Sequence, residues 1–174
     1  MTLLVGGVQA DDTPHLVDRA ARVSPQYELL SDTTTTQNAG PGYGLAADYE
    51  FFVRPKFRLG ILMAYRWFPG GVTLGQLGYG LLLRHYVGAS DPYERSGWHP
   101  YTAYGLLFQI STLGGRTGTA SSYDAALLLG SDFFINTQRA FIEGGFHISH
   151  ASFFEQPILV LCRWELSAGL MWEW

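Results

Sequence analysis

The chain of 174 residues is 47% hydrophobic and only 15% charged, whereas a soluble domain usually carries charges on about a quarter of its residues, so part of its surface is expected not to face water. No apolar run approaches the length of about 20 residues that a membrane helix needs. If such a chain crosses a bilayer, it must therefore do so as a closed barrel. The net charge of −4 and the lack of a basic cluster exclude a nucleic-acid footprint, and the single cysteine, Cys162, excludes an intrachain disulfide and a paired-cysteine metal site.

The first 23 residues differ from the rest and are expected to form a leader. Val8-Gln9-Ala10 resembles a signal-peptidase site, so residues 1–10 are interpreted either as the remnant of an export signal or as a flexible end. Thr13 is a suitable helix cap, and Pro14 would occupy the first helical position. Residues 11–23 are therefore expected to be either a short amphipathic helix or an irregular segment.

From Ser24 onward, apolar and polar residues alternate with a period of two, which is typical of β-strands. Turn residues such as Arg54-Pro55-Lys56, Pro69-Gly70-Gly71 and Asn136-Thr137 separate eight runs, which span 24–32, 42–53, 56–68, 72–87, 98–112, 119–134, 138–152 and 157–174. Several runs reach the length of about 9–11 residues that a tilted strand needs to cross a bilayer. We therefore predict that residues 24–174 form an all-β domain, an eight-stranded antiparallel up-and-down transmembrane β-barrel.

The two faces of the predicted strands differ in size and charge. In the third run, Ile61 and Met63 lie on a bulky apolar face, whereas Arg58 and Arg66 lie on the other face among small residues. A soluble barrel would carry bulky apolar residues inside and many charges outside, and this chain has too few charges for such a coat. Because an arginine facing the bilayer midplane costs about 2–4 kcal/mol, the arginine-bearing face is predicted to be the interior.

The interior is expected to hold a network of paired charges, since buried charges need partners. An eight-stranded barrel is just wide enough inside for side chains to fill it, so we expect a polar, plugged lumen and no conducting pore. The predicted network consists of Glu28, Asp48, Glu50, Arg58, Arg66, Arg84, Asp124, Asp132, Glu143, Arg163 and Glu165.

Aromatic residues near the strand ends are expected to form two belts at the bilayer interfaces, where amphipathic rings lie at the level of the headgroups. The residues assigned to these belts are Tyr43, Trp67, Tyr86, Trp98, Tyr101, Phe153 and Trp172. His85 and His99 lie near the same positions and are assigned to the belts as well.

These features resemble those of the small outer-membrane β-barrel family, which includes the transmembrane domain of outer-membrane protein A and protein X. The resemblance covers residues 24–174 and rests on the strand count, the inside-out pattern and the final residues 170–174, LMWEW. It implies a location in the bacterial outer membrane, with residues 1–23 in the periplasm and with membrane lipid and lipopolysaccharide as neighbours. The terminal aromatic strand is similar to the signal read by the barrel-assembly machinery, which is therefore an expected partner.

The resemblance also implies membrane anchoring, envelope stabilisation or surface interaction. Counted from a periplasmic N-terminus, the outer loops would cover 32–41, 69–72, 113–119 and 153–157, and all of them are short. This favours an anchor, an envelope-stabilising protein or a subunit with a protein partner in a membrane complex over an adhesin. No nucleic-acid partner, cofactor or metal is expected.

A second resemblance concerns residues 146–152, FHISHAS, which are similar to the His-x-Ser-Asn-Ala segment of the lipid A 3-O-deacylase family. It implies that Ser149 is a nucleophile and His147 its base in an ester hydrolase. In the alternative interpretation, strand alternation points both side chains inward with Glu143, as members of the interior network. We therefore expect a non-enzymatic outer-membrane protein, with a lipid A esterase as the alternative and a soluble ligand-binding barrel as a third hypothesis.

Overall fold

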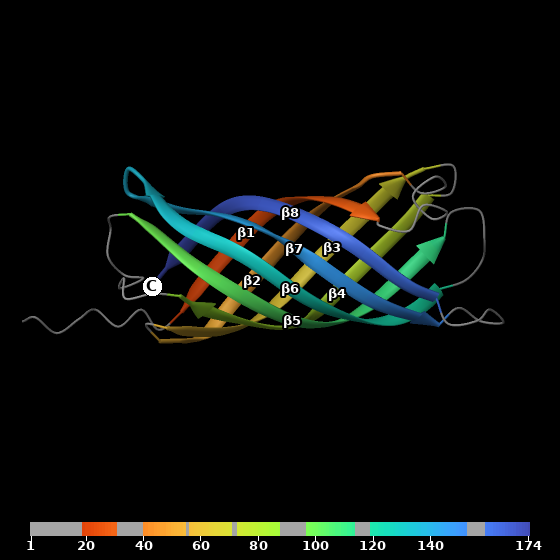
Figure 1. The fold of residues 1–174 in the computed structure, drawn as a ribbon, viewed down its shortest axis with the longest axis horizontal. Helices are drawn as coiled ribbons and strands as arrows, with labels where there is room; N and C mark the ends of the chain where they lie inside the picture. Colours follow the sequence, from red (N-terminus) through yellow and green to blue (C-terminus); the bar gives the residue numbers. More distant parts are fainter. Residues whose placement is uncertain are drawn as a thin grey trace, which may run out of the picture.

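The computed structural model describes residues 19–30, 40–54, 56–70, 73–87, 97–113, 119–152 and 159–174. They form the strands β1 (Ala20–Leu30), β2 (Gly42–Val53), β3 (Phe57–Pro69), β4 (Thr73–Tyr86), β5 (Trp98–Leu113), β6 (Thr119–Ile135), β7 (Gln138–Ser152) and β8 (Leu159–Glu173). Each strand pairs antiparallel with the next, and β1 also pairs with β8, so the sheet closes on itself (Figure 1). The predicted eight-stranded antiparallel barrel is confirmed. In the described part of the chain, no helix has the length and apolar character required to cross a membrane.

The first strand is longer than predicted. It begins at Ala20, four residues before Ser24, so Ala20 to Val23 belong to the barrel and not to the leader. These residues pair with both β2 and β8, and this pairing outweighs the weak helical pattern of the segment. The remainder of the predicted leader, residues 1–18, lies outside the described residues.

The barrel has two distinct ends. We call the end with the start of β1 and the end of β8 the termini end, and the opposite end the far end (Figure 1). The predicted turn at Asn136-Thr137 links β6 to β7 at the termini end, with Asn136 in the left-handed region at a φ of 58°. Asparagine tolerates this conformation better than most residues. The turn between β2 and β3 also lies at the termini end.

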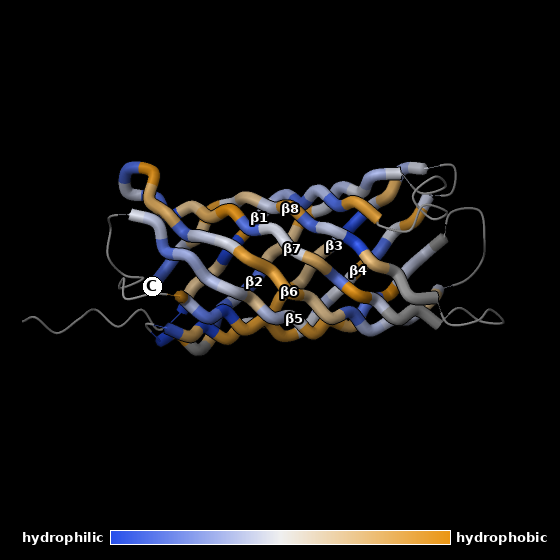
Figure 2. The backbone as a smooth tube through the Cα atoms, in the orientation of Figure 1, coloured by the Kyte–Doolittle hydropathy of each residue, from blue (hydrophilic) through white to orange (hydrophobic). Residues whose placement is uncertain are grey.

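Buried and exposed side chains alternate along most of the barrel, with an interruption in β7, where Arg139, Ala140 and Phe141 are all buried. Hydrophobic and hydrophilic residues are likewise interspersed along the strands (Figure 2). Bulky apolar residues such as Met63, Leu106 and Leu129 lie on the outer face, while Arg58 and Arg66 are buried in the interior. A side-chain period of two places one kind of residue on each face. The strands therefore place bulky apolar side chains outside and charged side chains inside, as predicted.

One residue of β2 departs from the predicted alternation. Strict alternation in the run 42–53 predicts Val53 on the outer face with Phe51, but Val53 is buried. The register between β2 and β3 shifts between Glu50 and Phe52, so Phe51 is an extra residue. A bulge of one residue reverses the facing of every position beyond it, which turns Val53 inward opposite Arg58.

The seam between β1 and β8 closes the barrel and is interrupted near its middle. Pairing runs from Ala20 to Val23 and resumes at Gln26, leaving out Ser24 and Pro25, and proline has no N–H to donate to a ladder. Beside this gap, Gly169 lies close to β1, because a Cβ added there would be 2.1 Å from the Val23 carbonyl oxygen. The seam therefore requires a glycine at position 169.

Candidate functional site

The candidate site is the interior of the barrel, where the inward positions of the eight strands converge. All eleven residues predicted for the interior network are buried: Glu28, Asp48, Glu50, Arg58, Arg66, Arg84, Asp124, Asp132, Glu143, Arg163 and Glu165. They belong to every strand except β5. Their contacts divide them into two clusters, one toward each end of the barrel.

The cluster toward the termini end is organised around Glu50. Its carboxylate lies 3.3 Å from Arg22 Nε, 3.2 Å from Arg58 Nη1 and 2.8 Å from Arg84 Nη1. Arg84 also donates two hydrogen bonds to Asp48, at 3.1 and 2.8 Å. Such two-pronged pairs combine strong attraction with a fixed geometry. Four of the five groups were predicted from the sequence, and Arg22 was missed because it precedes the predicted strand.

A second carboxylate of this cluster, Asp132, holds two arginines. Its Oδ2 lies 3.1 Å from Arg22 Nη2 and 3.0 Å from Arg139 Nη2, and it accepts a hydrogen bond from the Tyr86 hydroxyl. Arg139 reaches Glu173 at 2.8 Å near the barrel mouth. Sequence reasoning missed Arg139 and Glu173, although the period of two relates them to the predicted residues Glu143 and Glu165.

Tyr86 and Tyr101 face the interior, so their assignment to the aromatic belts is wrong. Both are buried, their ring centroids are 5.3 Å apart, and Arg22 donates to their hydroxyls at 2.9 and 3.0 Å. His99 is buried as well and does not belong to a belt. The cause is strand alternation, because Tyr86 lies two residues after the inward Arg84 and pairs directly with Tyr101.

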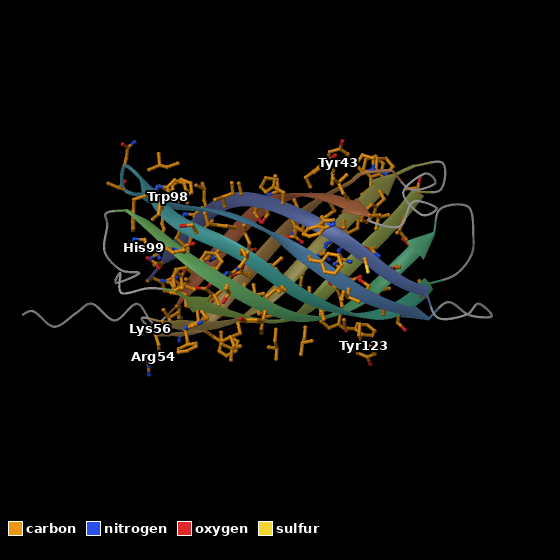
Figure 3. The ribbon with its side chains drawn as sticks, in the orientation of Figure 1. Tyr43, Arg54, Lys56, Trp98, His99 and Tyr123 are labelled. Carbon is orange, nitrogen blue, oxygen red and sulfur yellow. The ribbon has the colours of Figure 1, made fainter. Side chains whose placement is uncertain are left out.

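The other predicted belt residues have mixed outcomes. The exposed members are Tyr43, Trp67, Trp98 and Trp172, and His85 is half-buried and stacks on the Phe57 ring. Phe153 lies outside the described residues. Trp98 lies at the termini end of the barrel, whereas Tyr43 and Tyr123 lie at the far end (Figure 3).

The cluster toward the far end surrounds His147. Its Nδ1 lies 2.9 Å from Asp124 Oδ2, and its Nε2 lies 3.0 Å from Glu165 Oε2. The Ser149 hydroxyl donates to Asp124 Oδ1 at 2.8 Å and accepts a hydrogen bond from Arg163 Nη1 at 3.0 Å. Both nitrogens of His147 therefore face carboxylates, and Ser149 bridges a carboxylate and a guanidinium.

This geometry does not match an activated serine. An activated serine would donate the hydrogen bond of its hydroxyl to its base, here His147, whereas the Ser149 hydroxyl donates to Asp124 Oδ1, and both Ser149 and His147 are buried in the interior. Glu143 lies 3.5 Å from Arg84 and belongs to the cluster toward the termini end. The structure thus brings Ser149 and His147 into one ion-pair network and places Glu143 in the other.

A small apolar cluster lies beyond the far-end charge cluster. Phe68, Leu30 and Leu74 are buried and form one cluster at the ends of β1 and β3 and the start of β4. Two residues further into the barrel along β3 and β1, Arg66 pairs with Glu28. Three apolar side chains therefore separate this ion pair from the far end of the barrel.

Several solved structures of small barrels are similar to this chain. Neisserial surface protein A matches with a TM-score of 0.67 and 12% identity, over 90% of this chain and 97% of that one. The N-terminal β-barrel domain of Pseudomonas aeruginosa OprF matches with a TM-score of 0.56 and 14% identity, over 88% and 97%. The outer membrane protein OprG of the same organism matches with a TM-score of 0.52 and 13% identity, over 90% and 95%.

The chain has the fold of the small outer-membrane β-barrels. The resemblance inferred from the sequence is confirmed at the level of this fold. No protein-family model and no curated protein matches the chain. The comparisons give no support to the second resemblance, to lipid A deacylases. Fold alone leaves function open, so function must be argued from the interior and the surface of this barrel.

Proposed function

We propose that this chain is an integral protein of the bacterial outer membrane that acts without catalysis, as an anchor, an envelope-stabilising protein or a subunit of a membrane assembly. The observation that carries the proposal is the separation of side chains between the two faces. Every charged side chain described within a strand is buried, apart from the half-buried Glu173, while the outer face exposes bulky apolar residues from all eight strands.

The outer face favours lipid over water as its surroundings. Monomeric soluble proteins rarely expose contiguous apolar patches above a few hundred Å², whereas this wall exposes side chains such as Leu106, Leu129 and Trp164 around the barrel. Outer-membrane lipid and lipopolysaccharide are the proposed neighbours of this wall. The exposed Trp172 and Trp174 at the end of β8 support the barrel-assembly machinery as a partner during insertion.

The interior favours a structural role over transport. Ion pairs link several strands within both charge clusters, and Phe68 lies with two buried leucines in an apolar cluster toward the far end. In a narrow barrel, such side chains occupy the space that a water-filled channel would need. We therefore infer a plugged lumen whose ion pairs hold the strands in register.

Cell fractionation tests the membrane assignment. When the full chain is produced in a Gram-negative bacterium, it is expected in the outer-membrane fraction and to remain there after an alkaline wash, because its wall is apolar. Release of folded protein into the soluble fraction would contradict the proposal and favour a soluble ligand-binding barrel.

A hydrolysis assay tests the absence of catalysis. The purified protein is incubated with lipid A in mild detergent, and released fatty acid is measured by mass spectrometry. We expect no product, since Ser149 is buried and bonded to Asp124. Product formation by the wild type that disappears in Ser149→Ala would overturn the non-enzymatic proposal and establish the esterase alternative.

A further inference from the structure

The exposed charged side chains of the described residues are all cationic and all lie at one end. Arg19, Arg54 and Lys56 are exposed, while the other charged side chains in this part of the chain are buried, except the half-buried Glu173. Glu173 itself lies 2.8 Å from Arg58 Nη2. The described residues of the far end carry no exposed charge. Among the described residues, exposed cationic side chains are therefore confined to the termini end.

The three cations are held by adjacent elements at the termini end. Arg19 exchanges two backbone hydrogen bonds of 3.2 Å with Trp174, which fixes it beside the end of β8. Arg54 and Lys56 lie in the turn from β2 to β3, which two backbone bonds between Arg54 and Phe57 close at 2.8 and 3.2 Å. The Arg54 guanidinium donates a hydrogen bond to the Val53 carbonyl oxygen at 3.2 Å, and Arg54 and Lys56 lie at the same end of the barrel (Figure 3).

Exposed aromatic rings lie beside these cations at the termini end, and Trp174 and Phe57 are bonded through their backbones to Arg19 and Arg54. Tyr49 and Trp174 have ring centroids 6.3 Å apart, Phe57 stacks on His85 at 4.6 Å, and Phe51 is exposed nearby. Exposed aromatic rings at the end of a membrane barrel mark the level of the headgroups. Cations beside these rings are therefore within reach of the lipid phosphates of the same headgroup layer.

We propose that Arg19, Arg54 and Lys56 form a basic rim that binds the phosphates of anionic phospholipids in the leaflet at the termini end. A phospholipid fits the surface in both of its parts, because its phosphate meets the rim while its acyl chains lie against Phe51 and Phe57. Cationic side chains at a membrane surface attract anionic lipids with about a fivefold gain for each charge. The membrane position of the rim rests on the proposed function, whereas its lipid preference is measured separately.

Native mass spectrometry of the full chain tests the rim. The protein is inserted into bilayers of equal parts phosphatidylcholine and phosphatidylglycerol, extracted in mild detergent, and the ratio of the two lipids retained per barrel is measured. Wild type is expected to retain phosphatidylglycerol preferentially. The variant R54Q/K56Q is expected to lose this preference by at least about tenfold, whereas the charge-preserving variant R54K/K56R is expected to keep it.

Three results would overturn the proposal. They are equal retention of both lipids by wild type, an unchanged preference in R54Q/K56Q, and an equal loss of preference in R54K/K56R. Circular dichroism shows whether each variant has folded, and both changes lie in an exposed turn. A chain that fails to insert into bilayers at all would instead contradict the proposed membrane location, so the two failures are distinguishable.

Discussion

Glu50 pairs with three arginines, more than any other carboxylate described above for its cluster. Three guanidinium groups approach its oxygens within 3.3 Å, those of Arg22, Arg58 and Arg84. Moving ions out of water costs several kcal/mol each, and close pairing offsets that cost. The loss of this one negative charge would leave three buried cations short of a partner.

The change Glu50→Gln keeps the shape of the side chain and removes its charge. We expect it to lower the free energy of unfolding by about 3–5 kcal/mol, the usual cost of breaking a buried ion pair. Guanidinium titration in detergent micelles measures this value. Glu173→Gln is the matched control, because Glu173 is partly exposed at the barrel mouth, and its effect should be clearly smaller. Equal effects of both changes would refute the account of Glu50.

Residue positions inside the barrel were predictable where a charge marked the inward face. Arg58, Arg66 and Arg84 could be placed because lipid would penalise them outside. Tyr86 and Tyr101 could not be placed by chemistry alone, since tyrosine suits both a membrane belt and a buried network. The pairing of Ser149 with Asp124 was also unpredictable, because it depends on the register between β6 and β7.

At the scale of elements, the seam between β1 and β8 is where closure is most sensitive to side-chain size. Gly169 leaves no room for a methyl group next to the Val23 carbonyl oxygen, at 2.1 Å. Gly144 on the neighbouring β7 is also within a strand, but its added Cβ would lie 3.4 Å from the nearest atom, which is an ordinary contact. The two glycines therefore form a matched pair.

Gly169→Ala is expected to destabilise the barrel by about 1–3 kcal/mol, because backbone of β1 or β8 must shift to admit the methyl group. Gly144→Ala is expected to change the stability by less than about 1 kcal/mol. Denaturant titration of both variants in the same detergent gives the comparison. If Gly169→Ala is as stable as Gly144→Ala, the close approach at the seam is wrong.

Strand positions were largely predictable, since alternation and turn residues mark them. The sequence placed the starts of β2, β5, β6 and β7 at the residues observed, 42, 98, 119 and 138. The start of β1 and the bulge at Phe51 were not predictable, because both depend on pairing with distant strands. The local sequence pattern does not reveal which distant strands a segment pairs with.

At the scale of the whole molecule, the interior should not conduct ions. Both charge clusters and the buried side chains of Phe68, Leu30 and Leu74 lie on the inner face of the barrel. Wild-type protein reconstituted into planar bilayers is expected to show no single-channel current steps. Tryptophan fluorescence of the same vesicle stock verifies insertion. Reproducible steps whose size follows salt concentration would show that the lumen is an open path.

The central claim is that the bulky face of each strand meets lipid and the charged face is enclosed. Leu106 and Leu107 test it at one depth, because they are neighbours in β5 with exposures of 71% and 2%. Each is replaced by cysteine in a Cys162→Ser background and spin-labelled in lipid vesicles. We expect oxygen dissolved in the bilayer to relax the label at position 106 strongly and the label at 107 weakly. Stronger relaxation at 107 than at 106 would contradict the assignment of the two faces.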